Sequence, residues 1–222
     1  MGAYLILGAG HFGRLALLRL AAAAEAASFT ILDHRPEALA TAEALGIPRL
    51  RPVQAEAIPW LAANLPGETA WDWIIPMVPE HVAVGWLRRN RCCPGDWEPV
   101  YVPDEVAGLA PVAHRGREGE LYLSRAAHLC PDDCLEPEDV CPVTGESRRP
   151  ALFEALAAQV LPGVTVTVIP SRQLAPGVGG FAPKELLEAA GRLAEGRDLA
   201  LVATACRCHG VAHMLKRRST GP

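Results

Sequence analysis

The chain has 222 residues, half of them apolar, and a formal net charge of −4, which fits one large domain or two small ones with a proper hydrophobic core. The weak negative charge gives no electrostatic reason to expect nucleic-acid binding. The chain has no long uncharged apolar stretch, so membrane insertion is not expected either. Because the first predicted strand begins almost at Met1, with no signal-peptide pattern before it, a cytoplasmic location is expected.

Strand-like and helix-like segments alternate over the first hundred residues. Short apolar or β-branched runs predict strands at residues 4–7, 29–32, 50–53, 73–78 and 99–102. The stretches between them predict helices at residues 14–27, 36–45, 57–64 and 80–89. Strands that alternate with helices imply a parallel sheet with right-handed crossovers, so a Rossmann-like, doubly wound α/β fold is expected.

The pattern changes after this segment. A hairpin is predicted over residues 112–124, and residues 125–149 form a long irregular loop with three cysteines. Helices are then predicted at residues 151–160, 183–195 and 209–218, and strands at residues 164–169 and 199–203. A Gly/Pro loop is predicted at residues 175–181. The chain is thus divided into three parts: a Rossmann-like domain (1–104), a hairpin with a cysteine-rich loop (105–149), and an α/β C-terminal portion (150–222). This last portion either extends the first sheet or forms a small second lobe.

The first predicted strand runs into a GxGxxG loop, Gly8-Ala9-Gly10-His11-Phe12-Gly13, which leads into the first predicted helix. In such a loop Gly8 permits a tight turn, Gly10 lets the backbone approach a pyrophosphate, and Gly13 lets the helix pack closely on the strand. The helix start offers free amide N–H groups and the positive end of the helix dipole to an anion. The loop therefore predicts a dinucleotide as the bound partner.

Asp33 follows Gly13 by twenty residues, at the end of the second predicted strand, where a carboxylate accepts hydrogen bonds from the adenosine ribose. A carboxylate there repels a 2′-phosphate, so NAD(H) is the expected cofactor, while Arg35 nearby leaves NADP(H) as the alternative. His11 could bond a phosphate, but a histidine at a helix start is more often simply tolerated. The predicted cofactor-binding residues are Gly8, Ala9, Gly10, His11, Phe12, Gly13, Asp33, His34 and Arg35.

With its glycine loop and the later run Ile31-Leu32-Asp33, the segment 1–90 resembles the TrkA-N (RCK) nucleotide-binding domains. Domains of that family regulate potassium uptake and respond to bound NAD(H) or other nucleotides. The resemblance implies that Gly8, Gly10, Gly13 and Asp33 hold the cofactor and that the protein responds to a nucleotide. A homodimer or a regulatory protein partner is compatible with such a domain. The resemblance does not extend beyond this segment.

Two groups of cysteines follow. The loop has the spacing C-x3-C-x6-C, and a C-x-C pair comes just after the predicted strand 199–203. Thiolates are the soft donors that zinc and iron–sulfur clusters prefer, so three loop thiols and one from the pair predict a metal site, and the Cys-Pro steps favour iron–sulfur. Reversible disulfide chemistry and cysteines without a joint role are the alternatives. The predicted metal ligands are Cys130, Cys134, Cys141, Cys206 and Cys208.

Three functions are compatible with these features. The favoured one is an NAD(H)-binding protein that responds to nucleotide or redox state and acts as a regulatory or binding protein. The second is an NAD(H)-dependent oxidoreductase that uses the cysteine site as an electron relay. The third is a structural module in which a bound metal braces the loop. No catalytic residue can be assigned from spacing, and Cys92 and Cys93 are interpreted as structural or incidental.

Overall fold

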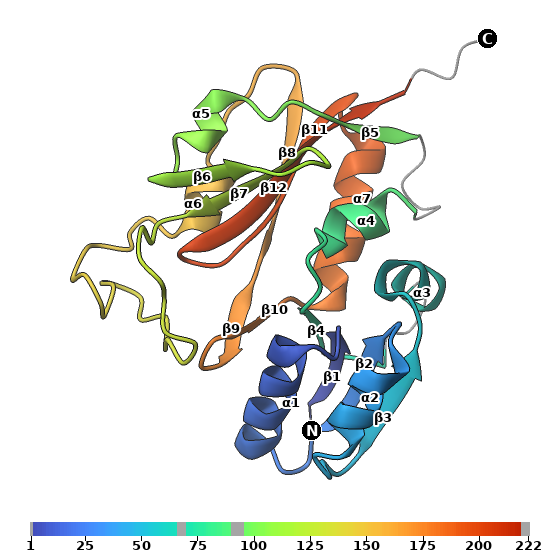
Figure 1. The fold of residues 1–222 in the computed structure, drawn as a ribbon. Coiled ribbons are helices and arrows are strands. Elements are labelled where there is room, and N and C mark those ends of the chain that lie inside the picture. The colour runs from blue at the N-terminus through green and yellow to red at the C-terminus, as the bar shows by residue number, and fades with distance from the viewer. Residues whose placement is uncertain (1, 66–69, 90–95, 219–222) are drawn as a thin grey trace.

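The computed structural model describes residues 2–65, 70–89 and 96–218. Its secondary structure is mixed α/β, as predicted from the sequence, and a four-stranded parallel sheet lies below a larger mixed sheet in the view of Figure 1. Within the described ranges, no helix is long and apolar enough to cross a membrane. Cys92 and Cys93 lie outside the described residues, so their predicted structural role stays a prediction.

The parallel sheet has the strand order β3-β2-β1-β4. Its strands are β1 (Ala3–Leu7), β2 (Ser28–Asp33), β3 (Leu50–Gln54) and β4 (Trp73–Pro76). Successive side chains of a strand point to opposite faces, so Ile6 packs in the cluster with the first two helices and Leu5 packs in the cluster on the other face. These two helices are α1 (His11–Ala23) and α2 (Pro36–Glu43), and the other face is covered by α3 (Ala57–Asn64) and α4 (Val82–Leu87).

The mixed sheet has the order β6-β7-β12-β11-β8, and β5 pairs with β12. Only β8 and β11 are parallel neighbours, because the other pairs of this sheet are antiparallel. Its strands are β5 (Trp97–Val100), β6 (Val112–Arg115), β7 (Glu120–Ser124), β8 (Val164–Pro170), β11 (Leu199–Ala205) and β12 (His209–Arg217). One face packs on α5 (Asp104–Ala107) and α6 (Leu152–Ala157), and the other packs on α4 and α7 (Pro183–Glu195).

A short hairpin connects the two sheets. Strand β9 (Arg172–Ala175) continues the path of β8 down to the parallel sheet, where β10 (Val178–Gly180) lies beside β4 (Figure 1). Ile74 and Phe181 exchange backbone hydrogen bonds of 2.8 and 3.0 Å at this edge. A Cβ atom at Gly180 would lie 2.9 Å from the Ile74 carbonyl oxygen, so glycine permits this close approach.

Three expectations about the secondary structure and the sheets are wrong. The terminal helix predicted over 209–218 is the strand β12, an inner strand of the mixed sheet. Helices cover both faces of this sheet, so the apolar run of β12 lacks the alternation that marks a strand with one exposed face. The Gly/Pro loop over 175–181 contains β10. The strand predicted at 99–102 is β5, which joins the mixed sheet and not the first.

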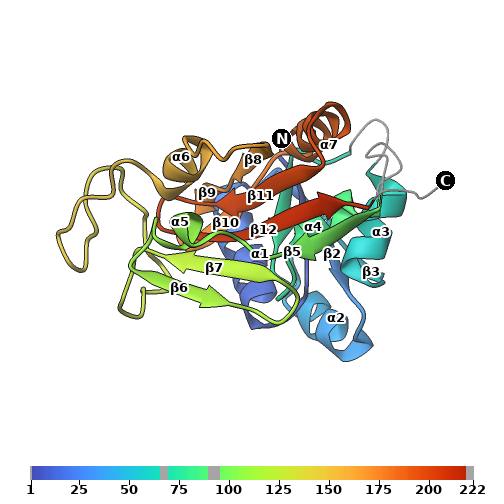
Figure 2. The same ribbon diagram turned by 90° about the horizontal axis from the view of Figure 1, so that it is seen from above.

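The C-terminal strands therefore do not extend the parallel sheet but form the mixed sheet together with β5 and the β6–β7 hairpin. The long irregular loop over 125–149 is present, and Figure 2 shows it extending from one end of the mixed sheet. The division of the chain into three parts stays a prediction. In this arrangement the carboxyl end of β4 and the β11–β12 turn, where the predicted C-x-C pair lies, line one hollow between the two sheets.

Candidate functional site

The glycine loop connects β1 directly to α1. Gly8 has a φ of +105°, and a Cβ atom there would lie 2.6 Å from the Met77 carbonyl oxygen. A Cβ atom at Gly13 would overlap the carbonyl oxygen of Gly8, so these two glycines are needed by the packing of the chain itself. At Gly10 a Cβ atom would meet only the Arg35 guanidinium, at 3.8 Å. The space in front of Gly10 is therefore open.

Asp33 anchors this loop from the end of β2. Its side chain is 5% exposed, and Oδ2 accepts a hydrogen bond of 2.8 Å from the Ala9 amide. Its Oδ1 accepts hydrogen bonds from the Arg35 amide at 2.9 Å and the Arg35 Nε at 3.1 Å. Burial by itself raises the pKa of Asp33, but the hydrogen bonds from Arg35 and Ala9 outweigh it and lower the pKa to about 2. The carboxylate is therefore charged over the physiological range.

A cavity of about 450 Å³ opens beside this loop, and we call it the glycine-loop cavity. Five of the nine predicted cofactor-binding residues line it, namely Gly8, Gly10, Asp33, His34 and Arg35. The others do not line it: Ala9 is buried and bonded to Asp33, Gly13 is packed against the strand, His11 is exposed at the start of α1, and the exposed Phe12 lines a different hollow. The two segments predicted to bind the cofactor thus meet in one place.

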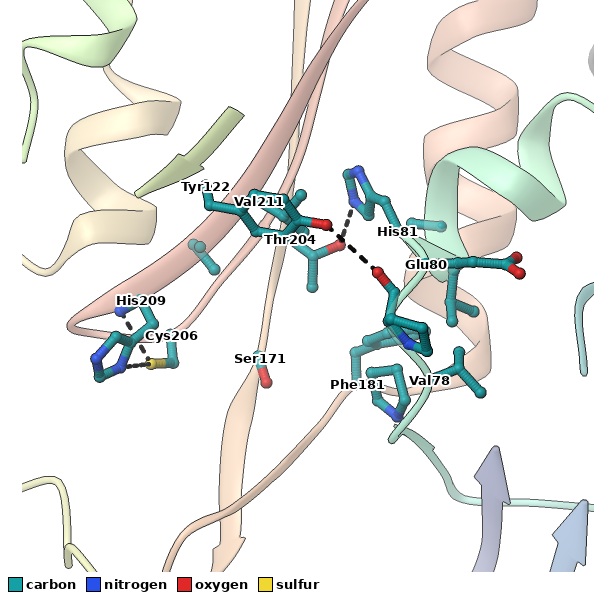
Figure 3. Close-up of a pocket in the computed structure, with 16 residues that line it drawn as sticks. Val78, Glu80, His81, Tyr122, Ser171, Phe181, Thr204, Cys206, His209 and Val211 are labelled. Atoms are coloured by element: carbon teal, nitrogen blue, oxygen red, sulfur yellow. Dashed lines mark hydrogen bonds between the residues drawn. The ribbon is translucent and has the colours of Figure 1, made fainter. Parts of the chain in front are cut away.

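A second hollow of about 370 Å³, the central cavity, lies between the two sheets and shares Val78, Pro79 and Glu80 with the first. Figure 3 shows His81 and Tyr122 at one end of it and Cys206 and His209 at the other. The Tyr122 hydroxyl donates a hydrogen bond of 3.3 Å to the Pro79 carbonyl oxygen.

His81 is the buried polar group of the central cavity. Its Nε2 is 3.0 Å from Thr204 Oγ1, and its Nδ1 is 2.9 Å from Nδ1 of His213. Burial, reinforced by the nearby His213, lowers the pKa of His81 well below its usual range, and burial also lowers the pKa of His213. The two rings are therefore neutral at neutral pH and share one proton in their mutual hydrogen bond.

A third hollow of about 500 Å³, the cysteine cavity, shares Ser171, Cys206 and His209 with the central cavity. The cysteines that line it are Cys130, Cys134, Cys206 and Cys208. Arg148 also lines it, is 4% exposed, and donates from Nη2 to Cys134 Sγ at 3.6 Å. The fifth predicted ligand, Cys141, lines a small neighbouring hollow with Cys130 and Cys208.

All five predicted metal ligands therefore gather around Arg148. Within the described ranges, however, no three His, Cys, Asp or Glu side chains stand ready as the ligands of a single metal ion. Burial, with Glu136 nearby, raises the pKa of the Cys206 thiol to about 12, whereas the backbone amides of Thr144 and Val143 lower that of Cys141 to about 6.

Sequence reasoning missed Arg148 and the roles of His81, Tyr122 and His213. The two histidines are separated by 132 positions, with His81 just before α4 and His213 in β12, so no local spacing connects them. Arg148 stands at the end of the cysteine-rich loop, but nothing in its neighbours signals a buried guanidinium. The C-x-C pair follows a strand, as expected, but that strand belongs to the mixed sheet and not to the parallel one.

The comparisons with known proteins place the chain in a family. A family model described as "Uncharacterized protein, C-terminal domain" matches residues 78–218. A protein of Archaeoglobus fulgidus with the name "Uncharacterized protein" is 32% identical over 204 residues, which cover 85% of this chain and 88% of that protein. The chain therefore belongs to this family. No solved structure matches it.

These matches correct the resemblance to the TrkA-N (RCK) domains, which is wrong as a family assignment. The segment that carried the resemblance contains a glycine loop and an acidic residue that many nucleotide-binding α/β proteins share, so those residues do not distinguish one family from another. The matched family model covers residues 78–218, which include all five cysteines of the described loop and turn.

The buried carboxylate of Asp33 gives a pH-dependent contribution to stability. Its pKa is lowered in the folded chain, so the stabilisation is complete above the unfolded value near 4 and is lost as the pH falls toward 2. We expect the Asp33→Asn variant to be less stable than the wild type at pH 6, and the difference in unfolding free energy to shrink by about 1 kcal/mol at pH 3.

Urea unfolding at the two pH values measures this difference. The matched control is Asp198→Asn, at a carboxylate that is 81% exposed, for which the difference from the wild type should stay within about 0.5 kcal/mol at both pH values. A difference between Asp33→Asn and wild type that is the same at pH 6 and pH 3 would contradict this interpretation.

Proposed function

We propose that the chain binds NAD(H) at the carboxyl ends of β1 and β2, and that its first 90 residues are a Rossmann-like, doubly wound unit. Three features support this: the parallel order β3-β2-β1-β4, the glycine loop between β1 and α1, and Asp33 at the end of β2. In sheets of this kind ligands bind outside the carboxyl ends of the strands, where the strand order reverses. Here β1 is the strand of reversal, and the glycine-loop cavity opens at its end.

The observation that carries the proposal is the open space at Gly10. Within the loop, Gly8 and Gly13 are explained by contacts inside the chain, but the missing side chain at Gly10 leaves room that the protein does not use. Gly10 is also the N-cap of α1, where no side chain caps the helix and no acidic residue stands in the first turn. The first amides of α1 are thus available to a pyrophosphate that approaches over Gly10.

The adenosine ribose is assigned to Asp33. Arg35 now occupies both carboxylate oxygens, with Nε on Oδ1 and Nη2 on Oδ2, but its side chain is 48% exposed. Ion pairs this exposed stabilise a protein by at most about 1 kcal/mol, so ribose hydroxyls can replace the guanidinium at small cost. The charged carboxylate then disfavours a 2′-phosphate, which supports NAD(H) over NADP(H).

We infer a regulatory or binding role from what lies next to this site. Arg19 of α1 donates to the carbonyl oxygens of Asp132 in the cysteine-rich loop and Pro176 in the β9–β10 hairpin, at 2.7 and 2.8 Å. The helix whose start would hold the pyrophosphate is therefore bonded to the cysteine region through Arg19, and its Phe12 and Leu15 line the cysteine cavity. A bound nucleotide that shifts α1 would also shift that loop, as a nucleotide- or redox-responsive protein requires.

A second candidate is an NAD(H)-dependent oxidoreductase that uses the cysteine region as an electron relay. Its specific support is the central cavity, which adjoins the glycine-loop cavity and shares Cys206 and His209 with the cysteine cavity. Anaerobic NADH absorbance with and without an electron acceptor separates the two roles. The regulatory role predicts binding without turnover, whereas sustained oxidation that Cys206→Ser abolishes would favour the oxidoreductase.

The Gly10→Ala variant tests nucleotide binding directly. In the free protein the added methyl group meets only Arg35, so the free energy of unfolding should stay within about 0.5 kcal/mol of the wild type. In the complex that methyl group occupies the approach of the pyrophosphate, so we expect NADH affinity to fall at least about tenfold, which corresponds to about 1.4 kcal/mol. Titration calorimetry measures both proteins.

Gly191→Ala serves as the matched control, because it adds the same methyl group within α7 where no atom lies within 4 Å. It should bind NADH as the wild type does. Absence of heat with the folded wild type, or equal affinities of Gly10→Ala and wild type, would contradict the proposal.

The Arg35→Ala variant tests the choice of cofactor. Removing the guanidinium frees Asp33, so NADH should bind as well as to the wild type or a few-fold more tightly, and NADPH should bind weakly to both proteins. Competition titrations of the two coenzymes measure the ratio. If the wild type preferred NADPH and lost that preference in Arg35→Ala, then Arg35 would hold a 2′-phosphate and the choice of NAD(H) would be wrong.

A further inference from the structure

The cysteines of the cysteine cavity come from two segments that are distant in the sequence and bonded firmly together. The Arg207 amide, in the C-x-C turn, donates to Oε1 of Glu136 at 2.8 Å, and its side chain pairs with Glu138 at 2.8 Å. The Arg125 amide donates to the Cys208 carbonyl oxygen at 2.8 Å. These bonds hold the cysteine-rich loop against the β11–β12 turn, so the fold itself brings the thiols of the two segments together.

Backbone amides point at two of the sulfur atoms, although burial raises the pKa of the free Cys206 thiol. Sγ of Cys206 accepts hydrogen bonds from the amides of Cys208 and His209, at 3.5 and 3.4 Å. Sγ of Cys134 accepts one from the Glu136 amide at 3.4 Å. Amide N–H···S bonds stabilise negative charge on sulfur, and hydrogen bonds of this kind tune metal–thiolate centres. A neutral thiol gains little from them.

Arg148 is the second, independent observation. Its side chain is 4% exposed, lines the cavity, and has a buried Nε without a hydrogen-bond partner. Its Nη2 donates to Cys134 Sγ, and its Nη1 donates to the Pro137 carbonyl oxygen. Among the residues that the structure describes, no carboxylate forms an ion pair with Arg148. A buried guanidinium without a counter-charge is costly, so negative charge on the surrounding sulfur atoms would balance it.

The size of the cavity favours a cluster over a single ion. Four thiolates on one zinc ion sit about 2.3 Å from the metal and therefore only about 3.8 Å from one another. Sγ of Cys130 and Sγ of Cys206 each contact a ring nitrogen of His209, at 3.7 and 4.0 Å. Within the described residues, however, no three such side chains gather on one point, and the four cysteines line a cavity of about 500 Å³. A cluster of several iron and sulfide ions fills a larger space and keeps its cysteine ligands farther apart.

We propose that Cys130, Cys134, Cys206 and Cys208 bind an iron–sulfur cluster in the cysteine cavity. Each thiol loses its proton as it binds iron, and the positive charge of Arg148 balances the negative charge of the bound cluster. Cys141 does not line this cavity, so we do not assign it as a ligand. This inference does not depend on nucleotide binding, because it rests on the thiols, the amides and Arg148 alone.

The experiment uses the full chain, purified anaerobically and incubated with ferric iron, sulfide and a thiol reductant. We expect a brown protein with a broad visible absorbance band, iron and acid-labile sulfide in equal amounts, and a paramagnetic resonance signal after reduction. Cys134→Ser and Cys206→Ser should lose most of the iron and sulfide. Cys141→Ser, the matched thiol control, should retain wild-type amounts, and circular dichroism checks that each variant is folded.

Three results would overturn the proposal. A folded wild type that stays colourless and free of iron after this treatment excludes the cluster. Binding of zinc with no sulfide, seen by elemental analysis, would mean a single-ion site instead. Loss of the cluster in Cys141→Ser together with its retention in Cys206→Ser would show that the ligand assignment is wrong.

Discussion

Helices α4 and α7 fix the two sheets relative to each other, and both candidate sites depend on this packing. Side chains of the parallel sheet, such as Leu5 and Leu7, and of the mixed sheet, such as Val202 and Leu215, belong to one buried cluster with Trp86 of α4 and residues of α7. Because this core is continuous, the sheets are held in one arrangement, in which the carboxyl end of β4 lies across a hollow from the β11–β12 turn. The central cavity is the space that remains between them.

The features that could be predicted from the sequence are local ones. The glycine loop, Asp33 and the helices α3 and α7 follow from short patterns, and the structure has α3 and α7 at the predicted bounds. The errors concern pairing across the chain: β12 has both faces covered and therefore resembles a helix in its apolar pattern. The partners of Arg148 and the His81–His213 contact are non-local too, so no spacing rule could find them.

The proposed nucleotide and the proposed cluster lie at opposite ends of three adjoining cavities. The glycine-loop and central cavities share Val78 to Glu80, and the central and cysteine cavities share Ser171, Cys206 and His209. Arg19 adds a second connection, from α1 to the backbone of the cysteine-rich loop. A dinucleotide in the first cavity and a redox centre in the third would thus be connected through the residues of the central cavity and through α1.

The most direct test of the central claim is hydrogen–deuterium exchange of the full chain with and without saturating NADH, followed by mass spectrometry. We expect slower exchange in peptides that contain residues 8–14 and 33–35, because a bound diphosphate and ribose would occupy those amides and the carboxylate beside them. Unchanged exchange in both segments, in folded protein at saturating coenzyme, would contradict nucleotide binding at this site.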